Sequence, residues 1–229
     1  MTGAGSGIGQ ATALLLRERG HAVLATDLAE GSLTPVVAAG AQALATDLSE
    51  PEGRARLLDA LDAGPAPDGL VNAAGRLVVR PIDEVSVEDF RLTFATNVES
   101  TFFLCQAMGP RMTGGGSIVN FSSPSAKFVA TTEAATYAAS KAAISQVTRS
   151  FAMAFADRPG GPIRVNALSP GITDTPMQSG VLDEVSRSRG IPATSWNGPG
   201  WRPCRCVAPR RPPRSRDGSC GCSPMRRAT

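Results

Sequence analysis

The sequence predicts an α/β fold in which helices cover both faces of a doubly wound parallel sheet within a single domain. Short apolar, β-branched segments alternate with stretches of helical length along most of the chain. A glycine-rich turn opens the first predicted helix. The length of 229 residues, with 42% hydrophobic and 19% charged residues, suits one globular domain, which we place at residues 1–200.

The predicted strands are continuous apolar runs, which is typical of strands buried on both faces. We predict strands at residues 21–26, 69–72, 117–121 and 163–168. We predict helices at residues 8–19, 52–63, 87–112 with a break near Asn97, and 136–156. Clusters of glycine and proline at residues 64–69, 113–116 and 159–162 predict the loops where helices give way to strands.

Composition argues against several classes of function. The sequence has no apolar run of the ~18 residues that a membrane span needs and no secretory signal pattern, so we expect a cytoplasmic protein without a membrane partner. The single histidine, His21, cannot supply both a metal cluster and a hydrolase base, so we expect neither a metal site nor Ser-His-Asp chemistry. Cys105 lies in an apolar stretch and is expected to be an inert core residue.

The first motif is the segment Thr2-Gly-Ala-Gly-Ser-Gly-Ile-Gly9 at the start of a predicted helix. Gly3, Gly7 and Gly9 stand where a backbone turns sharply and approaches a pyrophosphate at a helix N-terminus. Alone this is a weak motif, because glycine-rich turns are common. It predicts a dinucleotide-binding, Rossmann-like turn only together with the features that follow it.

Asp27 supplies the second feature, since it ends the next predicted strand. A dinucleotide fold places there the carboxylate that hydrogen-bonds the adenosine ribose. This carboxylate would repel a 2′-phosphate, and neither Ser6 nor Leu28 offers a cation to hold one. The sequence therefore predicts NAD rather than NADP as the cofactor.

The sharper motif is Tyr137-Ala-Ala-Ser-Lys141, which places a phenol and an ammonium one turn apart on one helix face. Tyr137 is the only tyrosine, and the only other lysine is Lys127, so chance placement is a poor explanation. A tyrosine that exchanges protons near neutrality needs a pKa well below its ordinary value of about 10. We expect the Lys141 cation to lower the pKa of Tyr137.

With these motifs the sequence is similar to the short-chain dehydrogenase/reductase family, over residues 1–178. The glycine turn, Asp27, Asp47, the Asn72-Ala-Ala-Gly75 segment, Asn97, the Asn120-Phe-Ser-Ser123 segment, the Tyr137–Lys141 pair and the Pro170-Gly171 turn match the family's motifs. The resemblance implies a cofactor site formed by Gly3, Ser6, Gly7, Ile8, Gly9, Asp27, Asp47, Leu48, Asn72, Ala73, Gly75, Tyr137, Lys141, Pro170, Gly171, Ile172, Thr173 and Thr175.

The resemblance also implies the reaction, which is reversible hydride transfer between a secondary alcohol, or its ketone, and NAD. Tyr137 would exchange the proton, Ser123 would hold the substrate oxygen, and Lys141 would bind the nicotinamide ribose. Asn97 would position a water of the proton relay, or would simply satisfy backbone groups at a helix break. Ser122 competes with Ser123, because the family's serine-to-tyrosine spacing is one residue shorter than the spacing from Ser123 to Tyr137.

Both ends of the sequence depart from the family pattern. Only Met1 precedes Thr2, so we predict that the sheet lacks most of its first strand, and we hypothesise that a GTG valine codon was taken as the start. The family's closing strand, which ends in Asp-Gly-Gly, has no counterpart here. We hypothesise a frameshift near residues 198–202 and predict that the last strand is missing as well.

Residues 201–229 differ in composition from the rest of the chain. They hold eight arginines against Asp217, a charge of +7 within a total of +3, and they are rich in proline. Such a segment is expected to be disordered. Its four cysteines have spacers too short for a structural zinc site. Its arginines are not interleaved with aromatic residues, so a nucleic-acid partner is not expected.

Three hypotheses about function follow. The motifs favour an active NAD-dependent oxidoreductase with a small-molecule alcohol or ketone as substrate. The alternatives are a truncated, catalytically inactive fragment and a binding module that uses the basic tail. A homo-oligomer, dimer or tetramer, is expected from the family resemblance. Residues 178–199, the expected substrate lid, carry no readable specificity, so the substrate is not predicted.

Overall fold

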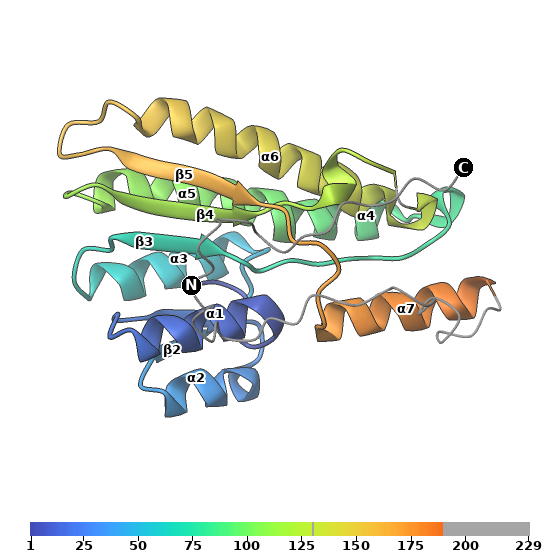
Figure 1. Ribbon diagram of the computed structural model, residues 1–229, viewed down its shortest axis with the longest axis horizontal. Helices are drawn as coiled ribbons and strands as arrows, with labels where there is room; N and C mark the ends of the chain where they lie inside the picture. Colours follow the sequence, from blue (N-terminus) through green and yellow to red (C-terminus); the bar gives the residue numbers. More distant parts are fainter. Residues whose placement is uncertain (130, 190–229) are drawn as a thin grey trace, which may run out of the picture.

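The computed structural model describes residues 1–129 and 131–189. These residues form an α/β fold with parallel strands and helices on both faces (Figure 1), so the predicted fold class is confirmed. The arginine-rich residues 201–229, with their four cysteines and the predicted frameshift, lie outside the described residues.

The parallel strands form two groups. Strands β1 (Leu24–Asp27) and β2 (Gln42–Ala45) pair with each other. Strands β3 (Gly69–Asn72), β4 (Gly116–Phe121) and β5 (Ile163–Leu168) pair in the order β3-β4-β5. The predicted strands 69–72 and 163–168 have their predicted bounds, whereas β1 begins three residues later than predicted. The sequence pattern does not predict β2, whose residues Gln-Ala-Leu-Ala include no β-branched side chain.

Thr2 joins the two groups of strands. It forms isolated parallel bridges to Thr26 of β1 and to Asn72 of β3. Its backbone N–H donates to Val71 O at 2.9 Å, and the N–H of Thr26 donates to Met1 O at 2.9 Å. The first two residues therefore occupy the position of a central strand, and no regular strand precedes β1 in the described part of the chain.

The helices cover the predicted ranges and add two more. They are α1 (Gly7–Glu18), α2 (Thr34–Ala38), α3 (Pro51–Asp62), α4 (Val87–Phe94), α5 (Ser100–Arg111), α6 (Ala135–Phe155) and α7 (Pro176–Arg189). The predicted break near Asn97 is confirmed as η3 (Ala95–Glu99), a π-helical turn between α4 and α5. Short 3₁₀ turns are η1 (Glu30–Leu33), η2 (Ile82–Glu84), η4 (Pro124–Ala126) and η5 (Thr132–Ala134).

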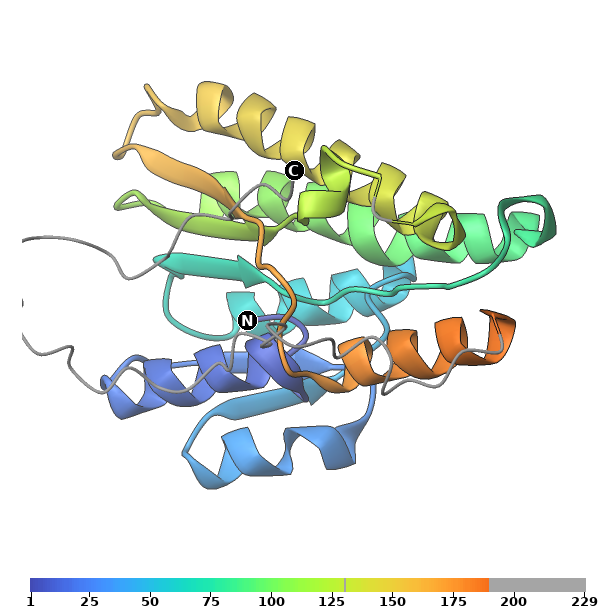
Figure 2. The same ribbon diagram turned by 45° about the vertical axis from the view of Figure 1, so that its right-hand side comes forward.

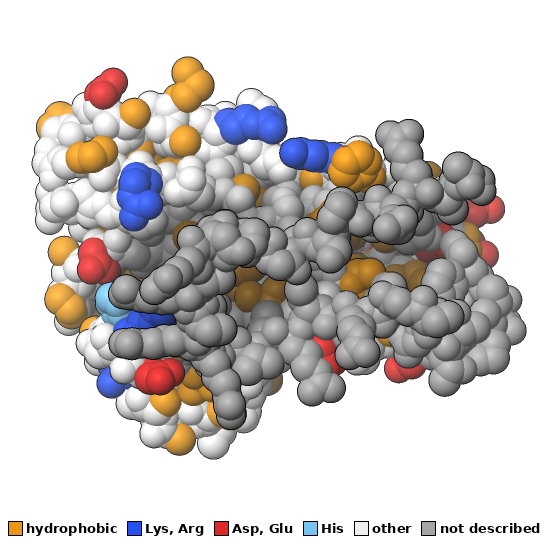
Figure 3. All heavy atoms as spheres, in the orientation of Figure 1, with side chains coloured by type: hydrophobic (Ala, Val, Ile, Leu, Met, Phe, Trp, Pro, Cys, Tyr) orange, Lys and Arg blue, Asp and Glu red, His pale blue; other side chains and the backbone are white. Residues whose placement is uncertain are grey.

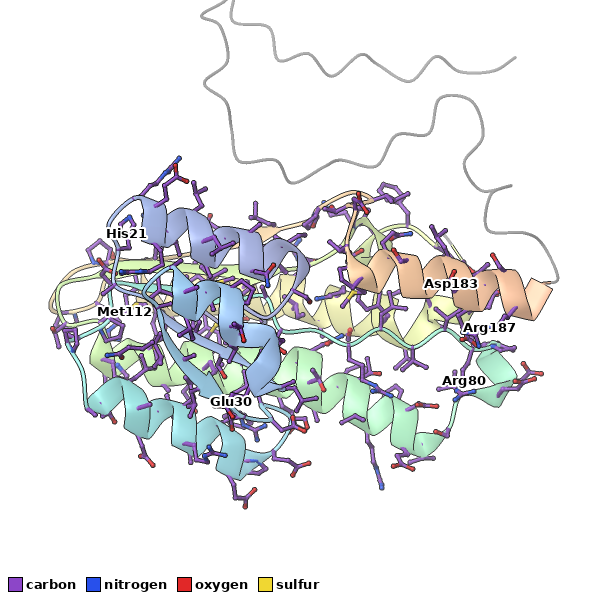
Figure 4. The ribbon with its side chains drawn as sticks, turned by 90° about the horizontal axis from the view of Figure 1, so that it is seen from below. His21, Glu30, Arg80, Met112, Asp183 and Arg187 are labelled. Carbon is purple, nitrogen blue, oxygen red and sulfur yellow. The ribbon has the colours of Figure 1, made fainter. Side chains whose placement is uncertain are left out.

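Two hydrophobic cores hold the helices on the sheet. Helices α3, α5 and α6 pack on β3, β4 and β5 through Leu57, Leu104, Met108, Ile118, Phe151 and Ile163. Helices α1 and α2 pack on β1 through Ala13, Ala25, Leu33 and Val36. Figures 1 and 4 show α1 on one face of the sheet and α3 and α5 on the other. Both faces of the sheet are therefore covered, as the apolar strands predict.

Cys105 lies inside the larger core, as predicted. Its side chain is fully buried, and burial raises the pKa of its thiol to about 11. A thiol with this pKa carries almost no thiolate near neutrality, which agrees with an inert residue. Among the described helices, none combines the length and the apolar character that crossing a membrane requires.

Candidate active site

A cavity of about 1170 Å³ lies at the carboxyl ends of the strands, where ligands bind in open α/β sheets. Its wall includes the end of β1, the loop after β2, the segment after β3, the end of β4 and the segment that leads from β5 into α7. Figure 2 shows the segments after β3 and β5 crossing this end of the sheet on their way to the outer helices. The motifs predicted from the sequence therefore meet around one space.

All the predicted cofactor-site and catalytic residues except Asn72 and Asn97 line this cavity. Asn72 lies behind the wall, where its side chain is buried and donates to Asn120 Oδ1 at 2.9 Å. The structure thus gives Asn72 a place in a buried polar cluster and no atom on the cavity surface. Asn97 is also fully buried.

The glycine-rich turn is a close backbone contact. Gly3 has φ +63°, and a Cβ there would lie 2.6 Å from the backbone of Ala73. A Cβ on Gly9 would lie 1.8 Å from Gly3 O, so a side chain cannot fit at this position. The turn opens α1, whose first turn holds no acidic residue and whose N-cap, Ser6, makes no side-chain capping bond. The N-terminal N–H groups of α1 can therefore serve an anion in the cavity.

Asp27 stands beside this turn and is held by backbone groups. Its Oδ2 accepts a hydrogen bond from Gly5 N at 2.7 Å, and its Oδ1 accepts one from Leu28 N at 2.7 Å. Each carboxylate oxygen keeps further acceptor capacity. The carboxylate is thus fixed in direction and can still accept hydrogen bonds from a ligand in the cavity.

Thr2 fixes the segment after β3 on the opposite side of the turn. Its side-chain Oγ1 accepts hydrogen bonds from Ala73 N and Ala74 N, both at 3.1 Å. The loop after β2 is fixed in a similar way, because Asp47 Oδ1 accepts from Ser49 N at 2.8 Å and from Ser49 Oγ at 2.7 Å. Both segments line the cavity with their backbones held in place.

Tyr137 and Lys141 project from α6 into this same cavity. The Lys141 ammonium lies 5.4 Å from the centroid of the Tyr137 ring, and it donates to Phe121 O at 2.7 Å. The side chain of Ser123 hydrogen-bonds to that of Tyr137. Strand β4 and helix α6 thus bring a hydroxyl, a phenol and an ammonium to one point, as the spacing and the resemblance predict.

The structure separates the two competing serines. Ser123 lines the cavity next to Tyr137, and its Oγ accepts from Ser125 N at 3.2 Å. Ser122 is buried, donates to Lys141 O at 3.0 Å and lies 2.7 Å from Ser145 Oγ. Ser122 therefore packs β4 against α6, and only Ser123 has its hydroxyl at the phenol.

Asn97 lies at the centre of η3 and ties three elements together. Its Oδ1 accepts from Arg76 N at 2.7 Å, and its Nδ2 donates to Arg76 O and to Ser140 Oγ, both at 2.9 Å. Ser140 in turn donates to Tyr137 O at 2.7 Å. The amide at the helix break therefore satisfies backbone groups of another segment, and through Ser140 it reaches the helical turn that carries the phenol.

The pKa values of the pair differ from the expectation. Burial raises the pKa of Tyr137 above 10.0, and the hydrogen bond to Ser123 offsets part of this effect. Burial also lowers the pKa of Lys141 to about 8. Desolvation favours the neutral form of each group, and it is the largest cause of both shifts. The expected lowering of the tyrosine pKa is therefore not seen in this structure.

Comparison with known proteins gives the family. A family model described as "Enoyl-(Acyl carrier protein) reductase" matches residues 3–196. The chain belongs to the short-chain dehydrogenase/reductase family. The resemblance stated from the sequence motifs is thereby confirmed.

This short-chain dehydrogenase/reductase is similar to proteins that carry alcohol dehydrogenase names. It is 35% identical over 216 residues to D-threitol dehydrogenase of Mycolicibacterium smegmatis. This match covers 87% of this chain and 73% of that protein. It is 36% identical over 195 residues to cis-4-hydroxycyclohexanecarboxylate dehydrogenase of Sinomonas cyclohexanicum. This match covers 81% of this chain and 76% of that protein.

Solved structures of the family show the same fold with either cofactor. A 4-hydroxyisoleucine dehydrogenase complexed with NADH and succinate has a TM-score of 0.73 and 30% identity, covering 82% of this chain and 81% of that one. A short chain dehydrogenase from Burkholderia cenocepacia in complex with NADP has a TM-score of 0.72 and 31% identity, covering 82% of this chain and 80% of that one. These relatives hold a nicotinamide cofactor of one kind or the other.

Part of this dehydrogenase's cavity wall was not predicted from the sequence. The segment after β3 and the helix α7 supply it with Arg76, Leu77, Val78, Val79, Arg80, Met177, Gln178, Gly180, Val181 and Glu184. In Figure 4, Arg80 lies at the same end of the molecule as Asp183 and Arg187 of α7, far from His21 and Met112. For the segment after β3 the sequence offers one weak signal, the apolar run at residues 77–79. For α7, residues 178–199 are expected to form a substrate lid, and residues 178–184 of it supply cavity-lining side chains, but the helix itself is not predicted. Residues 190–199 of the expected lid lie outside the described residues.

Proposed function

We propose that this chain is an NAD-dependent alcohol dehydrogenase/ketone reductase that transfers a hydride between a secondary alcohol and the nicotinamide. The observation that carries the proposal is the cluster of Ser123, Tyr137 and Lys141 in the same cavity as the glycine-rich turn and Asp27. A phenol, a hydroxyl and an ammonium at one point supply proton transfer but no acceptor for a hydride. A redox cofactor is therefore required, and it supplies the hydride chemistry when bound.

The residues present fit a dinucleotide. The first turn of α1 presents N–H groups to the cavity and holds no acidic residue of its own, which suits a pyrophosphate. Gly3 and Gly9 allow no side chain between this turn and its neighbours, so a phosphate can approach the backbone. Thr173, Thr175 and the Pro170–Ile172 turn line the cavity on the side of β5, where we propose that they hold the nicotinamide end.

We propose NAD as the preferred form because of Asp27. Its carboxylate is held in place by Gly5 N and Leu28 N, and its free acceptor capacity suits the two hydroxyls of a ribose. A 2′-phosphate would meet this negative charge, and neither Ser6 nor Leu28 supplies a cation in compensation. Asp47 and Leu48 line the same end of the cavity and are proposed to hold the adenine.

The chain's own residues then handle the proton. The Ser123 hydroxyl is held by Ser125 N and orients the substrate oxygen toward Tyr137. In alcohol oxidation, the Tyr137 oxygen accepts the hydroxyl proton while the carbon loses its hydride. An ammonium has three N–H donors, and Lys141 uses one of them on Phe121 O. The others are available to the ribose of the nicotinamide and to the electrostatic support of the phenolate.

Asn97 and the Arg76 backbone complete the proposed proton path. A Cβ on Gly75 would lie 3.6 Å from Asn97 Oδ1 and 3.7 Å from Lys141 Nζ, so the amide and the ammonium flank one glycine. Asn97 Oδ1 has a second lone pair beyond the one used by Arg76 N. We propose that this fixed amide positions the water that carries the proton onward from Lys141.

We propose small polyols and cyclic alcohols as the first substrates to test, because similar proteins are named for D-threitol and cis-4-hydroxycyclohexanecarboxylate. We also propose a homo-oligomer, which the exposed side chains of Val87, Phe90, Phe102 and Phe103 on α4 and α5 support. Nucleic acid is not proposed as a partner. On the face in Figure 3, the lysine and arginine side chains of the described residues stand in separate small groups.

The test is a panel of these alcohols with NAD or NADP, using the full chain and a Tyr137→Phe variant. We expect NADH to accumulate with wild type only, and we expect NAD to raise the melting temperature of both proteins. A melting temperature that neither cofactor raises contradicts the proposed site. Stabilisation by NADP alone contradicts the role of Asp27, and cofactor binding without turnover of any alcohol favours the inactive-fragment alternative.

A further inference from the structure

Arg54 is a buried cation that belongs neither to the catalytic cluster nor to the cavity wall. It lies in the first turn of α3, and only 10% of its side chain is exposed. Arginine is rarely buried to this extent unless its donors are satisfied. The groups that satisfy it therefore indicate what it does.

The guanidinium of Arg54 contacts three separate elements. Its Nη1 donates to Leu48 O and to Ser49 O, both at 2.9 Å. Its Nη2 lies 3.8 Å from a carboxylate oxygen of Glu99, the last residue of η3. Its central carbon lies 5.4 Å from the centroid of the Phe103 ring on α5. The one carboxylate in this set is distant and more than half exposed, so the two carbonyls are the close partners.

The two carbonyls belong to the loop that follows β2 and lines the cavity. Residues Thr46, Asp47, Leu48 and Ser49 all lie on the cavity wall. Helix α3 begins directly behind them, since a Cβ on Gly53 would lie 1.7 Å from Asp47 O. The hydrogen bonds between Asp47 and Ser49 thus fix the loop internally, and the close packing of α3 supports it on the side away from the cavity.

We propose that Arg54 is a positioning residue for the adenine end of the cofactor site, acting through the carbonyls of Leu48 and Ser49. This inference rests on the proposed function, which places a dinucleotide in the cavity with its adenine at Asp47 and Leu48. One nitrogen of the rigid, planar guanidinium holds both consecutive carbonyls, and an ammonium on a flexible stem is less pre-organised for this geometry. Removing it leaves both carbonyls in a buried place without a donor and frees the loop to shift.

The experiment measures binding of ADP-ribose and NAD by calorimetry with the full chain. ADP-ribose lacks the nicotinamide, so it reports on the adenine end and on the pyrophosphate without any catalytic step. Arg54→Met keeps the unbranched stem as far as about the position of Nε and removes the donors, and Arg54→Lys restores a charge without the planar guanidinium. Arg56→Met is the matched control, because Arg56 lies on the same helix and is exposed, with one long contact of 3.4 Å to Ala45 O.

We expect Arg54→Met to weaken ADP-ribose and NAD by the same factor, about tenfold, because two charge-assisted hydrogen bonds are lost. Arg54→Lys should fall between this variant and wild type, and it gives the same test if the methionine variant does not fold. Arg56→Met should bind as wild type does. At saturating NAD, kcat of the Arg54 variants should stay within about twofold of wild type, since the catalytic end is unchanged.

Two results would overturn the inference. One is unchanged ADP-ribose affinity in both Arg54 variants. The other is a loss of kcat as large as the loss of affinity, which would indicate a general structural role. Failure of the proposed function is a different result, because wild type itself would then bind neither ADP-ribose nor NAD.

Discussion

The two ends of the cavity are built by different means. At the end near α1 and β1, the wall is backbone in close contact, and a Cβ on Gly9 would lie 1.8 Å from Gly3 O. At the end near α6, the wall consists of side chains whose hydrogen bonds fix them, such as Ser123, Tyr137 and Lys141. At the first end, an added side-chain atom does not fit between the backbone segments. At the second end, removing a side-chain atom breaks a hydrogen bond or removes a reacting group. Adding a methyl group at the first end should therefore weaken cofactor binding, and removing an atom at the second end should slow catalysis.

The largest effect is expected at the end built from side chains. Tyr137→Phe removes the oxygen that exchanges the proton and leaves the ring in place. We expect kcat to fall by about 10²–10⁴-fold, the usual contribution of a general acid–base group, with NAD affinity unchanged. Steady-state kinetics and calorimetry with NAD measure the two quantities. A variant that keeps a tenth of the wild-type kcat would show that another group carries the proton.

The complementary change adds one methyl group to the end built from backbone. Gly9→Ala forces the new Cβ against Gly3 O, so either the turn or the start of α1 must move. Overpacking of this kind costs about 1–3 kcal/mol, so we expect NAD affinity to fall by about 10–100-fold. Gly31→Ala is the control, because a Cβ on Gly31 meets nothing within 4 Å. Equal NAD affinity in both variants would contradict the close-contact account.

The same contrast explains what could be predicted of the fold. Strands at 69–72 and 163–168 are short apolar runs between turn signals, and they are found at their predicted bounds. Helix α6 and the break at Asn97 also carry local signals, in the hydrophobic period and in its interruption. Strand β2 and helix α7 carry none, because the first lacks β-branched residues and the second holds Gly180 and many polar side chains.

The candidate site divides in the same way. A shared helix face brings Tyr137 and Lys141 together, and their spacing in the sequence is enough to predict it. The direction of the tyrosine pKa depends on how deeply α6 is covered by other elements, and the sequence does not contain that depth. Neither does it show that Arg54 is buried or that Asn72 lies behind the cavity wall. The sequence predicts which side chains share a helix face, but the desolvation of those side chains depends on the assembled fold.

The buried lysine gives a test of that desolvation. Its pKa of about 8 lies below the ordinary 10.5, so between these values the unfolded chain binds a proton that the folded chain does not. The Lys141 contribution to stability therefore rises with pH in this window, by ~1–2 kcal/mol from about pH 8 to about pH 9.5, whereas the thiol of Cys105, whose pKa burial raises to about 11, contributes an opposite change of ~1 kcal/mol that is the same in wild type and in the lysine variant. Urea unfolding of wild type and of Lys141→Met measures it, and the variant should lose the rise. The control variant Lys127→Met removes an exposed lysine and should keep the rise in unfolding free energy. If Lys141→Met shows a rise of the same size as wild type, the rise belongs to another group.

The smallest effect is expected where the catalytic end is held from behind. Ser140 is fully buried and links Asn97 Nδ2 to Tyr137 O. In Ser140→Ala the Asn97 amide keeps its hydrogen bond to Arg76 O but loses the one to the serine hydroxyl, which is worth about 1 kcal/mol. We therefore expect kcat to fall by about 3–10-fold, with the KM for NAD unchanged. Ser150→Ala is the control, since Ser150 lies exposed on α6 and donates only to Gln146 O of its own helix.

Combining Ser140→Ala with Asn97→Ala tests whether the two side chains act as one unit. If Ser140 acts by holding Asn97, the double variant should lose no more kcat than Asn97→Ala alone, because the partner of the serine is already gone. Independent contributions would instead multiply the two losses. Kinetics equal to those of Ser150→Ala would show that the backbone of η3 alone holds the amide. The catalytic end would then be fixed by backbone, as the opposite end is.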